Sequence, residues 1–236
     1  MSLHWASLTD VGRVRDHNED SVWPEAGTGT TDRRLVAGVA DGMGGHAGGE
    51  IASKTAIESA TGMGGSASVR VQAANLAVID TAARQSRLAG MGTTLTLAII
   101  SEDGTADIAH VGDSRAYRVH DGRLEQITTD HSYVAEMIEA GRLTPEEASV
   151  HPYRSVVTRA IGLDPGVEVD THQVLLEAGD RLILCSDGLT SMLDDAAVAE
   201  VLAGHDEPGA AVAALVEAAN LAGGADNISV VVVDRG

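Results

Sequence analysis

Acidic residues stand at the ends of several short apolar runs in this chain. Asp41 follows the run LVAGVA and precedes a glycine, and Asp187 follows RLILCS and also precedes a glycine. Runs of this length are typical of buried β-strands, and a carboxylate beside a glycine lets side chain and backbone approach a ligand together. A single Asp-Gly pair is most often a turn, so the repetition of the pattern is the feature that constrains the fold.

Three further carboxylates share this setting. Asp113 lies between two apolar runs, Asp226 directly precedes the final run ISVVVV, and Asp20 ends the segment NED. If these strands belong to one core, the carboxylates converge and repel one another until cations neutralise them. Hard divalent ions prefer oxygen ligands, and the chain has no Cys/His set with zinc spacing. The pattern predicts two Mg²⁺ or Mn²⁺ ions about 3.5–4 Å apart that activate a water for attack on phosphorus.

Composition narrows the class of protein. Hydrophobic residues make up 44% of the 236 residues, Phe is absent and aromatic residues are only 2%, so the core must consist of Ala, Val, Leu and Ile. The net charge of −19 predicts an acidic soluble surface and argues against nucleic acid as a partner, because phosphate backbones need Lys and Arg. Cys185 is the only cysteine, which excludes an intrachain disulfide and fits a reducing compartment.

The start of the chain lacks the charged and apolar regions of a signal peptide. No apolar stretch reaches the length that a membrane span needs. We therefore expect a cytoplasmic, monomeric protein with no membrane association.

Hydrophobic periodicity outlines the secondary structure. Helical spacing of small apolar residues begins at Ala47 and recurs from Val69 to Ala83 after a glycine-rich break. The predicted strands lie at residues 35–40, 93–100, 106–111, 116–119, 168–176, 181–185 and 228–233, and further helices at 131–141, from 145, at 195–202 and at 208–221. Asp-Gly pairs at 103–104 and 121–122 predict hairpin turns and thus an antiparallel meander. Strands and helices in runs favour a single α+β domain over residues 1–236, with a flap at about 131–162.

Six ordered motifs carry a family resemblance. They are Arg15-Asp16-His17-Asn18-Glu19-Asp20, Asp41-Gly42-Met43-Gly44-Gly45-His46, Gly92-Thr93-Thr94, Val111-Gly112-Asp113-Ser114-Arg115, Ser186-Asp187-Gly188-Leu189 and Asp226-Asn227. Together they resemble the bacterial branch of the metal-dependent protein phosphatase family (PPM, protein phosphatase 2C type). The resemblance implies a four-layer α-β-β-α sandwich of two antiparallel sheets flanked by helices. It also implies hydrolysis of phosphoserine and phosphothreonine in proteins by a metal-activated water, with Ser/Thr protein kinases as expected partners.

The resemblance assigns the two core ions. Asp41 would bridge both ions, and Gly42 would add its carbonyl oxygen. Asp187 and Asp226 would hold the first ion. Asp20, together with the neighbouring Glu19 in a supporting position, would bind the second ion through waters.

The resemblance also assigns the surrounding groups. Arg15 would clamp the substrate phosphate, which suits the planar fork of a guanidinium. Asp113, together with Asp187, would hold a third ion, to which Ser155 in the flap would contribute. Asn227 would orient Asp226 or a metal-bound water.

One position departs from the family's animal members. These have His directly after the Asp-Gly pair as a proposed general acid, whereas this chain has Met43 there and His46 three residues later. The proton donor to the leaving group is therefore either His46 or a metal-bound water. His46 is equally well explained as a loop or helix-capping residue.

The motifs allow three other readings. The spacing Gly42-x-Gly44-x-x-Ala47 mimics a dinucleotide-binding turn, but that fold needs a second parallel strand where helical spacing follows. Cys185 lacks the Arg six residues later that cysteine-dependent phosphatases use, so it is expected to be a buried strand residue. A module with the same fold that binds without catalysis is the serious alternative, and loss of a metal-binding Asp would indicate it.

Overall fold

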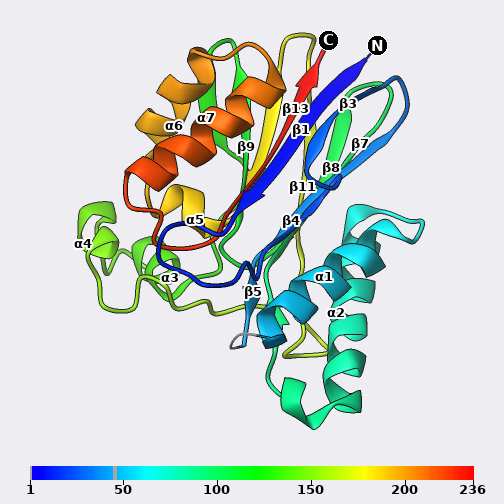
Figure 1. The fold of residues 1–236 in the computed structure, drawn as a ribbon, viewed down its shortest axis with the longest axis vertical. Helices are drawn as coiled ribbons and strands as arrows, with labels where there is room; N and C mark the ends of the chain where they lie inside the picture. Colours follow the sequence, from blue (N-terminus) through cyan, green and yellow to red (C-terminus); the bar gives the residue numbers. More distant parts are fainter. Residues whose placement is uncertain (1, 45–46) are drawn as a thin grey trace.

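The computed structural model describes residues 2–44 and 47–236 and has four layers (Figure 1). Two antiparallel β-sheets face each other, and one pair of long helices covers the outer face of each sheet. This arrangement confirms the predicted α+β sandwich. No helix in the described part of the chain is long and apolar enough to cross a membrane.

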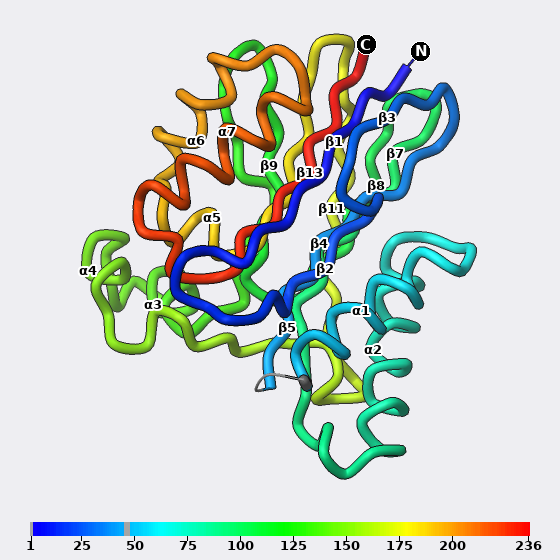
Figure 2. The backbone as a smooth tube through the Cα atoms, viewed as in Figure 1, coloured from blue at the N-terminus to red at the C-terminus, as the bar shows by residue number. Residues whose placement is uncertain are grey.

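Sheet A has six strands in the order β10-β9-β12-β13-β1-β3. Its strands are β1 (Leu3–Asp10), β3 (Gly27–Thr31), β9 (Arg115–His120), β10 (Arg123–Gln126), β12 (Arg181–Cys185) and β13 (Ile228–Arg235). The two ends of the chain meet in this sheet, since β1 pairs with β13 along its whole length, as Figure 2 shows.

Sheet B has five strands in the order β11-β8-β7-β4-β2, and a short third ladder joins β5 to β6. The strands are β2 (Ser21–Trp23), β4 (Leu35–Ala40), β5 (Gly42–Met43), β6 (Gly92–Thr93), β7 (Leu95–Ile100), β8 (Thr105–Val111) and β11 (Asp170–Leu175). The 3-10 turn η1 (Ser86–Leu88) leads into β6.

The helices fall into three groups. Helices α1 (Ala47–Thr61) and α2 (Ala67–Arg84) pack on sheet B, and α6 (Asp195–Ala203) and α7 (Pro208–Leu221) pack on sheet A. The short helices α3 (Tyr133–Glu139) and α4 (Pro145–Ser149) follow β10 and precede β11 along the chain. The short helix α5 (Asp187–Thr190) follows β12 directly. Since residues 47–84 are largely helical, the second parallel strand of a dinucleotide-binding fold is absent from this described stretch.

Period-2 alternation builds the two inner interfaces. In β13, Val231 and Val233 face the layer between the sheets, whereas Val230 and Val232 face α6 and α7. Successive side chains of a strand point to opposite faces, so one apolar run can serve both cores. Cys185 is buried on the helix side of sheet A, as predicted.

The predicted meander is wrong at one point. Strand β8 pairs with β7 and β11 in sheet B, whereas β9 pairs with β10 and β12 in sheet A. The chain therefore crosses from one sheet to the other at residues 112–114. The predicted strand 93–100 is also interrupted at Thr94, whose backbone N–H donates to the carbonyl of Asp41. Strands β1, β2, β3, β5 and β10 and helix α5 were not predicted.

The region of the predicted flap is mostly irregular and is held by its ends. At its start, the backbone N–H of His131 donates to Gly112 O at 2.7 Å. At its end, the N–H of Thr158 donates to His131 O, and Ile161 pairs with Thr93 in both directions. Within it, α4 begins at Pro145, where the sequence predicts a helix start, and Thr144 and Glu147 form a capping box there.

The core between the sheets gives a stability prediction. Leu184 is fully buried there, so Leu184→Ala should lower the free energy of unfolding by about 2–5 kcal/mol. Urea denaturation monitored by circular dichroism measures the change. Leu76→Ala is the matched control, because Leu76 on α2 is 55% exposed and should lose less than about 0.5 kcal/mol. Equal losses in both variants would contradict the assigned core.

Candidate metal centre

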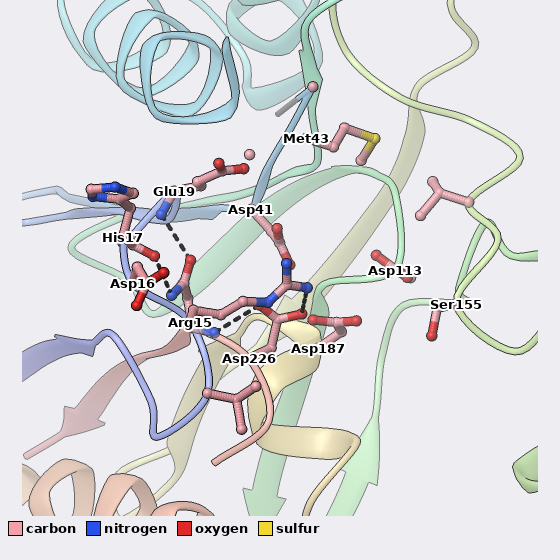
Figure 3. A pocket seen from close by; sticks show the side chains of 15 residues that line it. Arg15, Asp16, His17, Glu19, Asp41, Met43, Asp113, Ser155, Asp187 and Asp226 are labelled. Carbon is pink, nitrogen blue, oxygen red and sulfur yellow. Dashed lines mark hydrogen bonds and ion pairs between the residues drawn. The ribbon is translucent and has the colours of Figure 1, made fainter. Parts of the chain in front are cut away.

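Carboxylates from both sheets line one cavity of about 590 Å³. Figure 3 shows Asp41, Asp113, Asp187 and Asp226 pointing toward the same space, with Arg15 between them. The described lining comprises Val14, Arg15, Asp16, His17, Glu19, Asp41, Gly42, Met43, Gly44, Asp113, Ser155, Val157, Asp187, Asp226 and Asn227. Six of these side chains are acidic and one is a guanidinium, so the wall has a strong excess of negative charge.

The backbone of Asp41 is fixed by two threonines: Thr93, in β6, and Thr94, which follows this strand. Its backbone N–H donates to Thr94 Oγ1 at 2.9 Å, and its carbonyl accepts from Thr93 Oγ1 at 2.8 Å and from the Thr94 N–H at 2.9 Å. Gly42 follows, where an added Cβ would clash with the backbone of Gly49 and of Glu19. A side chain at position 42 would therefore displace the loop that carries Glu19.

Asp113 lies at the crossing between the two sheets. The hydroxyl of Ser114 is 2.7 Å from that of Thr94, and both residues are buried. Because the Thr94 hydroxyl also accepts from the Asp41 N–H, Thr94 links the loops of Asp41 and Asp113. On the other side, the Gly112 N–H donates to His131 Nδ1 at 3.0 Å. Asp113 is thus held between the Asp41 loop and the start of the flap.

Asp187 begins the four-residue helix α5 at the end of β12. The preceding Ser186 does not cap this helix with its side chain, because its hydroxyl donates to Asp20 Oδ2 at 2.8 Å and accepts from the Ser229 N–H at 3.0 Å. The next residue is Gly188, where a Cβ would clash with Asn227 O. The glycine lets the Asp187 turn and the Asp226-Asn227 turn come into contact.

Asn227 fastens the loop that carries Arg15. Its Nδ2 donates to the carbonyls of Val11 and His17, both at 2.9 Å, and its Oδ1 accepts from the Glu19 N–H at 2.8 Å. Its backbone N–H donates to Asp226 Oδ1 at 2.9 Å. The backbone of Asn227 therefore orients Asp226, whereas the side chain is fully engaged by the loop of residues 11–19.

Burial and mutual repulsion keep protons on this cluster. Burial, followed by the charge of Asp187, raises the pKa of Asp113 to about 7. Burial also raises the pKa of Asp20 to about 7, although hydrogen bonds from Ser229 and Ser186 oppose the shift. The pKa of Asp41 is raised by burial and by its acidic neighbours, and the pKa of Asp187 is raised mainly by burial.

Arg15 supplies the positive charge at the mouth of the cavity. Its Nη2 lies 2.7 Å from Asp226 Oδ2, and this hydrogen bond raises the pKa of Arg15. The guanidinium is more than half exposed, so it also faces solvent. The ion pair therefore offsets one carboxylate of an otherwise acidic cavity wall.

The donor set fits hard divalent cations. All of its side-chain donors are oxygens, which Mg²⁺ and Mn²⁺ prefer, and the buried oxygens Asp20 Oδ1 and Asp187 Oδ1 lack a hydrogen-bond partner. Among residues 2–44 and 47–236, no three His, Cys, Asp or Glu side chains already form a closed ligand group.

The structure brings together most of the predicted site residues. Nine of them line the cavity, namely Arg15, Glu19, Asp41, Gly42, Asp113, Ser155, Asp187, Asp226 and Asn227. Asp20 is not on the cavity wall but is buried below it, bonded to Ser186. His46 lies outside the described residues.

Sequence reasoning missed the groups that hold the cluster in place. Thr94 and Ser114 stand in quoted motifs, but no role was assigned to their hydroxyls, and the contact of Ser186 with Asp20 was not expected. His17 also lines the cavity without having been singled out. The chain offers no local signal for these contacts, because their partners lie 20 to 166 residues away.

Comparison with known proteins identifies the family. The family model "Protein phosphatase 2C" matches residues 13–221. The chain is 41% identical to the serine/threonine protein phosphatase PstP of Mycobacterium tuberculosis over 98% of its own length, and it spans 45% of that relative. It is 36% identical to the serine/threonine phosphatase stp of Listeria innocua, covering 99% of this chain and 96% of the relative.

Solved structures agree with this assignment. The crystal structure of Mycobacterium tuberculosis PstP/Ppp superposes with a TM-score of 0.90 at 39% identity, covering 100% of this chain and 99% of that chain. The PstP catalytic domain in complex with two manganese ions gives a TM-score of 0.86 at 37% identity, with 99% of both chains covered. The protein belongs to the protein phosphatase 2C family of metal-dependent phosphatases, which confirms the resemblance of its motifs.

The raised carboxyl pKa values predict how stability depends on pH. Without metal, the free energy of unfolding should fall as the pH rises from about 4 to above 7, because folded Asp20 and Asp113 keep protons that the unfolded chain has lost. Urea unfolding at pH 5 and pH 8 in EDTA measures the change. Excess Mn²⁺ should restore stability at pH 8, since a ligand that binds only the folded state stabilises it.

The control for the pH prediction is Asp113→Asn, which removes one of the two titrating groups. This variant should lose less stability between pH 5 and pH 8 than the parent protein. An equal loss in both proteins would mean that Asp113 does not titrate as described.

The side chain of Asn227 gives a second prediction. Asn227→Asp removes the two donors to Val11 and His17, which should cost about 1–3 kcal/mol of stability and speed amide hydrogen exchange in residues 11–19. Asn75→Asp is the matched control, because Asn75 bridges Gly162 and Asp164 in the same way on the far side of sheet B. It should lose stability without faster exchange in residues 11–19. Unchanged exchange there in Asn227→Asp would refute the assigned role.

Proposed function

We propose that the protein is a metal-dependent serine/threonine protein phosphatase that hydrolyses phosphoserine and phosphothreonine in proteins. The observation that carries this proposal is the convergence of acidic side chains from both sheets on one cavity with Arg15 at its mouth. Family membership supports it, and the relatives named above are serine/threonine phosphatases. The alternative, a module that binds without catalysis, is not favoured, because every aspartate that the motifs assign to the metal ions is present.

Arg15 is proposed to bind the phosphate of the substrate. Its guanidinium is exposed at the cavity and uses one nitrogen for Asp226, so it can present a two-nitrogen edge to phosphate oxygens when that ion pair opens. The same positive charge would attract a phosphate dianion to an otherwise acidic wall. Arg15 therefore accounts for both substrate orientation and substrate attraction.

Asp41 is proposed to hold both core ions, with Asp187 and Asp226 on the first and Asp20 and Glu19 on the second. Bound Mn²⁺ or Mg²⁺ would supply a water of lowered pKa as the nucleophile at neutral pH. The buried carboxyls would release their protons as ions bind, which makes metal affinity pH-dependent. Gly42 is proposed to contribute its carbonyl oxygen.

The remaining assignments are also proposals. Asp113 and Asp187, with Ser155, would hold a third ion. His46 or a metal-bound water is proposed to give a proton to the leaving alkoxide. A large loss of kcat in His46→Gln would favour His46, and an unchanged kcat would favour the water. Asn227 is proposed to position Arg15 through the loop of residues 11–19.

The wider setting is proposed from the same basis. Residues 1–236 would form one catalytic domain with a flap at about 131–162. Phosphorylated proteins, among them Ser/Thr protein kinases, would be its substrates and partners. A monomer in the cytoplasm fits the acidic surface and the single buried Cys185.

The direct test is phosphate release from p-nitrophenyl phosphate and from a phosphothreonine peptide. Activity should require Mn²⁺ or Mg²⁺ and disappear in excess EDTA. Asp187→Asn should abolish turnover while the fold persists, and Arg15→Ala should raise KM for both substrates by about 10-fold or more, as expected for loss of a charge-assisted contact. Full activity in EDTA would refute the metal mechanism, and no activity of a folded, Mn²⁺-loaded protein would favour the binding module.

A further inference from the structure

A second cavity, of about 800 Å³, opens directly beside the metal centre. The two cavities share Asp113, Ser155 and Asp187 in their walls. The second cavity lies between the flap helices α3 and α4 on one side and the segments around β9 and α5 on the other. We refer to it as the flap groove.

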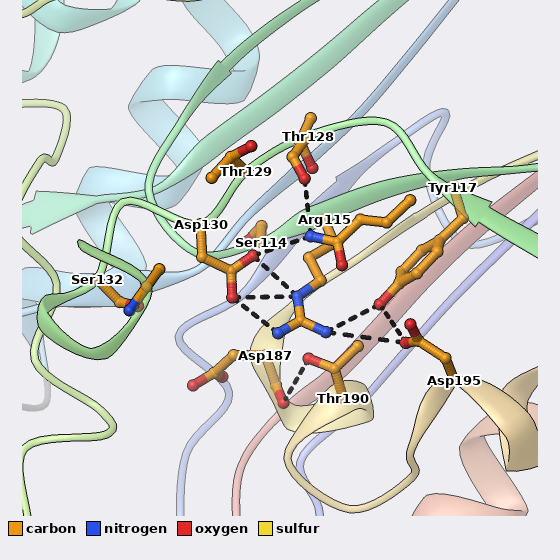
Figure 4. Close-up of polar contacts among 12 residues, drawn as sticks. Ser114, Arg115, Tyr117, Thr128, Thr129, Asp130, Ser132, Asp187, Thr190 and Asp195 are labelled. Carbon is orange, nitrogen blue, oxygen red and sulfur yellow. Dashed lines mark hydrogen bonds and ion pairs between the residues drawn. The ribbon is translucent and has the colours of Figure 1, made fainter. Parts of the chain in front are cut away.

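The floor of the flap groove is polar, but its charges are already paired. Figure 4 shows the guanidinium of Arg115 between Asp130 and Tyr117. Arg115 donates to both carboxylate oxygens of Asp130 at 2.7–3.1 Å and to the Tyr117 hydroxyl at 3.0 Å. The Tyr117 hydroxyl in turn donates to Asp195 at 3.0 Å. The charge of Arg115 is therefore paired with the carboxylates of Asp130 and Asp195.

The wall of the flap groove is aliphatic. Helix α3 contributes Val134, Ala135 and Ile138, which share one helical face, and α4 contributes Pro145 and Ala148. Ile138 is 36% exposed although it is a large aliphatic residue. Covering its exposed part with another aliphatic group removes apolar surface from water, which favours binding.

The charges at the rim of the groove favour neither an anionic nor a cationic ligand. Glu139 and Arg154 both line it and have opposite charges. The remaining acidic side chains of the groove, Asp113 and Asp187, lie at the end that it shares with the metal centre. Beside helices α3 and α4, none of the described lining residues presents an unbalanced charge to a ligand. The chemistry of the groove therefore selects an apolar group.

We propose that the flap groove binds an aliphatic side chain of the substrate polypeptide, two or three residues from the phosphorylated residue. The proposal rests on the proposed phosphatase function and deepens it. Since the cavities share three residues, a chain with its phosphate at the metal centre continues into the groove. An extended chain advances about 3.3 Å per residue, so two or three residues reach roughly 7–10 Å.

The test uses phosphothreonine peptides that differ only in one residue, placed two or three positions before or after the phosphothreonine, as Leu, Lys or Glu. For the wild-type protein with Mn²⁺, kcat/KM should be about 10-fold higher for Leu than for Glu at one of these positions. Ile138→Lys should prefer Glu at that position, and Ile138→Glu should prefer Lys. Opposite charge preferences in two variants of one residue indicate direct contact. General damage to the fold would instead lower kcat/KM for all peptides alike.

Two controls separate this proposal from the function on which it rests. Turnover of p-nitrophenyl phosphate should stay within about twofold in both Ile138 variants, because this substrate has no flanking residues. Leu76→Glu, on exposed α2 behind sheet B, should leave the peptide preferences unchanged. A flat peptide profile in the wild-type protein, or unchanged preferences in folded Ile138 variants, would overturn the groove proposal. Absence of Mn²⁺-dependent turnover of p-nitrophenyl phosphate would instead refute the phosphatase function.

Discussion

Mutual repulsion among buried carboxylates is the constraint on which the functional end of this structure depends. Asp41 comes from the end of a sheet B strand, Asp187 from the end of a sheet A strand and Asp113 from the crossing between the sheets. The sandwich therefore gathers negative charge at the edge where its two sheets meet. Raised carboxyl pKa values and the guanidinium of Arg15 offset part of that charge, and divalent cations are the chemical class that can neutralise the rest.

Carboxylates that repel one another stay together only if the loops that carry them are held in place. A set of buried hydrogen bonds between these loops does this. The hydroxyls of Thr94 and Ser114 join the loops of Asp41 and Asp113. Ser186 joins the Asp187 turn to Asp20, and Asn227 joins the Asp226 turn to the loop of Arg15. Since each tie uses a small polar side chain between two loops, the cluster is preorganised before any ion or substrate binds.

Periodicity and motif order predicted much of this architecture from the sequence. The apolar run before Asp41 and the helix at 208–221 were placed with the bounds that the structure has, because burial on both faces and a Pro at the first helical turn leave clear patterns. Strand β1 was missed because Ser7 and Thr9 interrupt its apolar pattern, and the crossing at 112–114 was missed because a hairpin and a change of sheet look alike locally. The ties through Thr94 and Asn227 were out of reach, since they depend on tertiary contacts over 53 and 216 residues.

The same end of the sandwich also carries the flap groove, which shares Asp113, Ser155 and Asp187 with the metal centre. The central claim is that Asp41, Asp187 and Asp226 together bind divalent cations. Anomalous X-ray scattering from crystals soaked in Mn²⁺ tests it most directly. The account predicts strong anomalous peaks in contact with Asp41 and between the Asp187 and Asp226 carboxylates, with the Arg15–Asp226 ion pair opened. No peak at this cluster under saturating Mn²⁺, or peaks confined to other acidic surface residues, would contradict it.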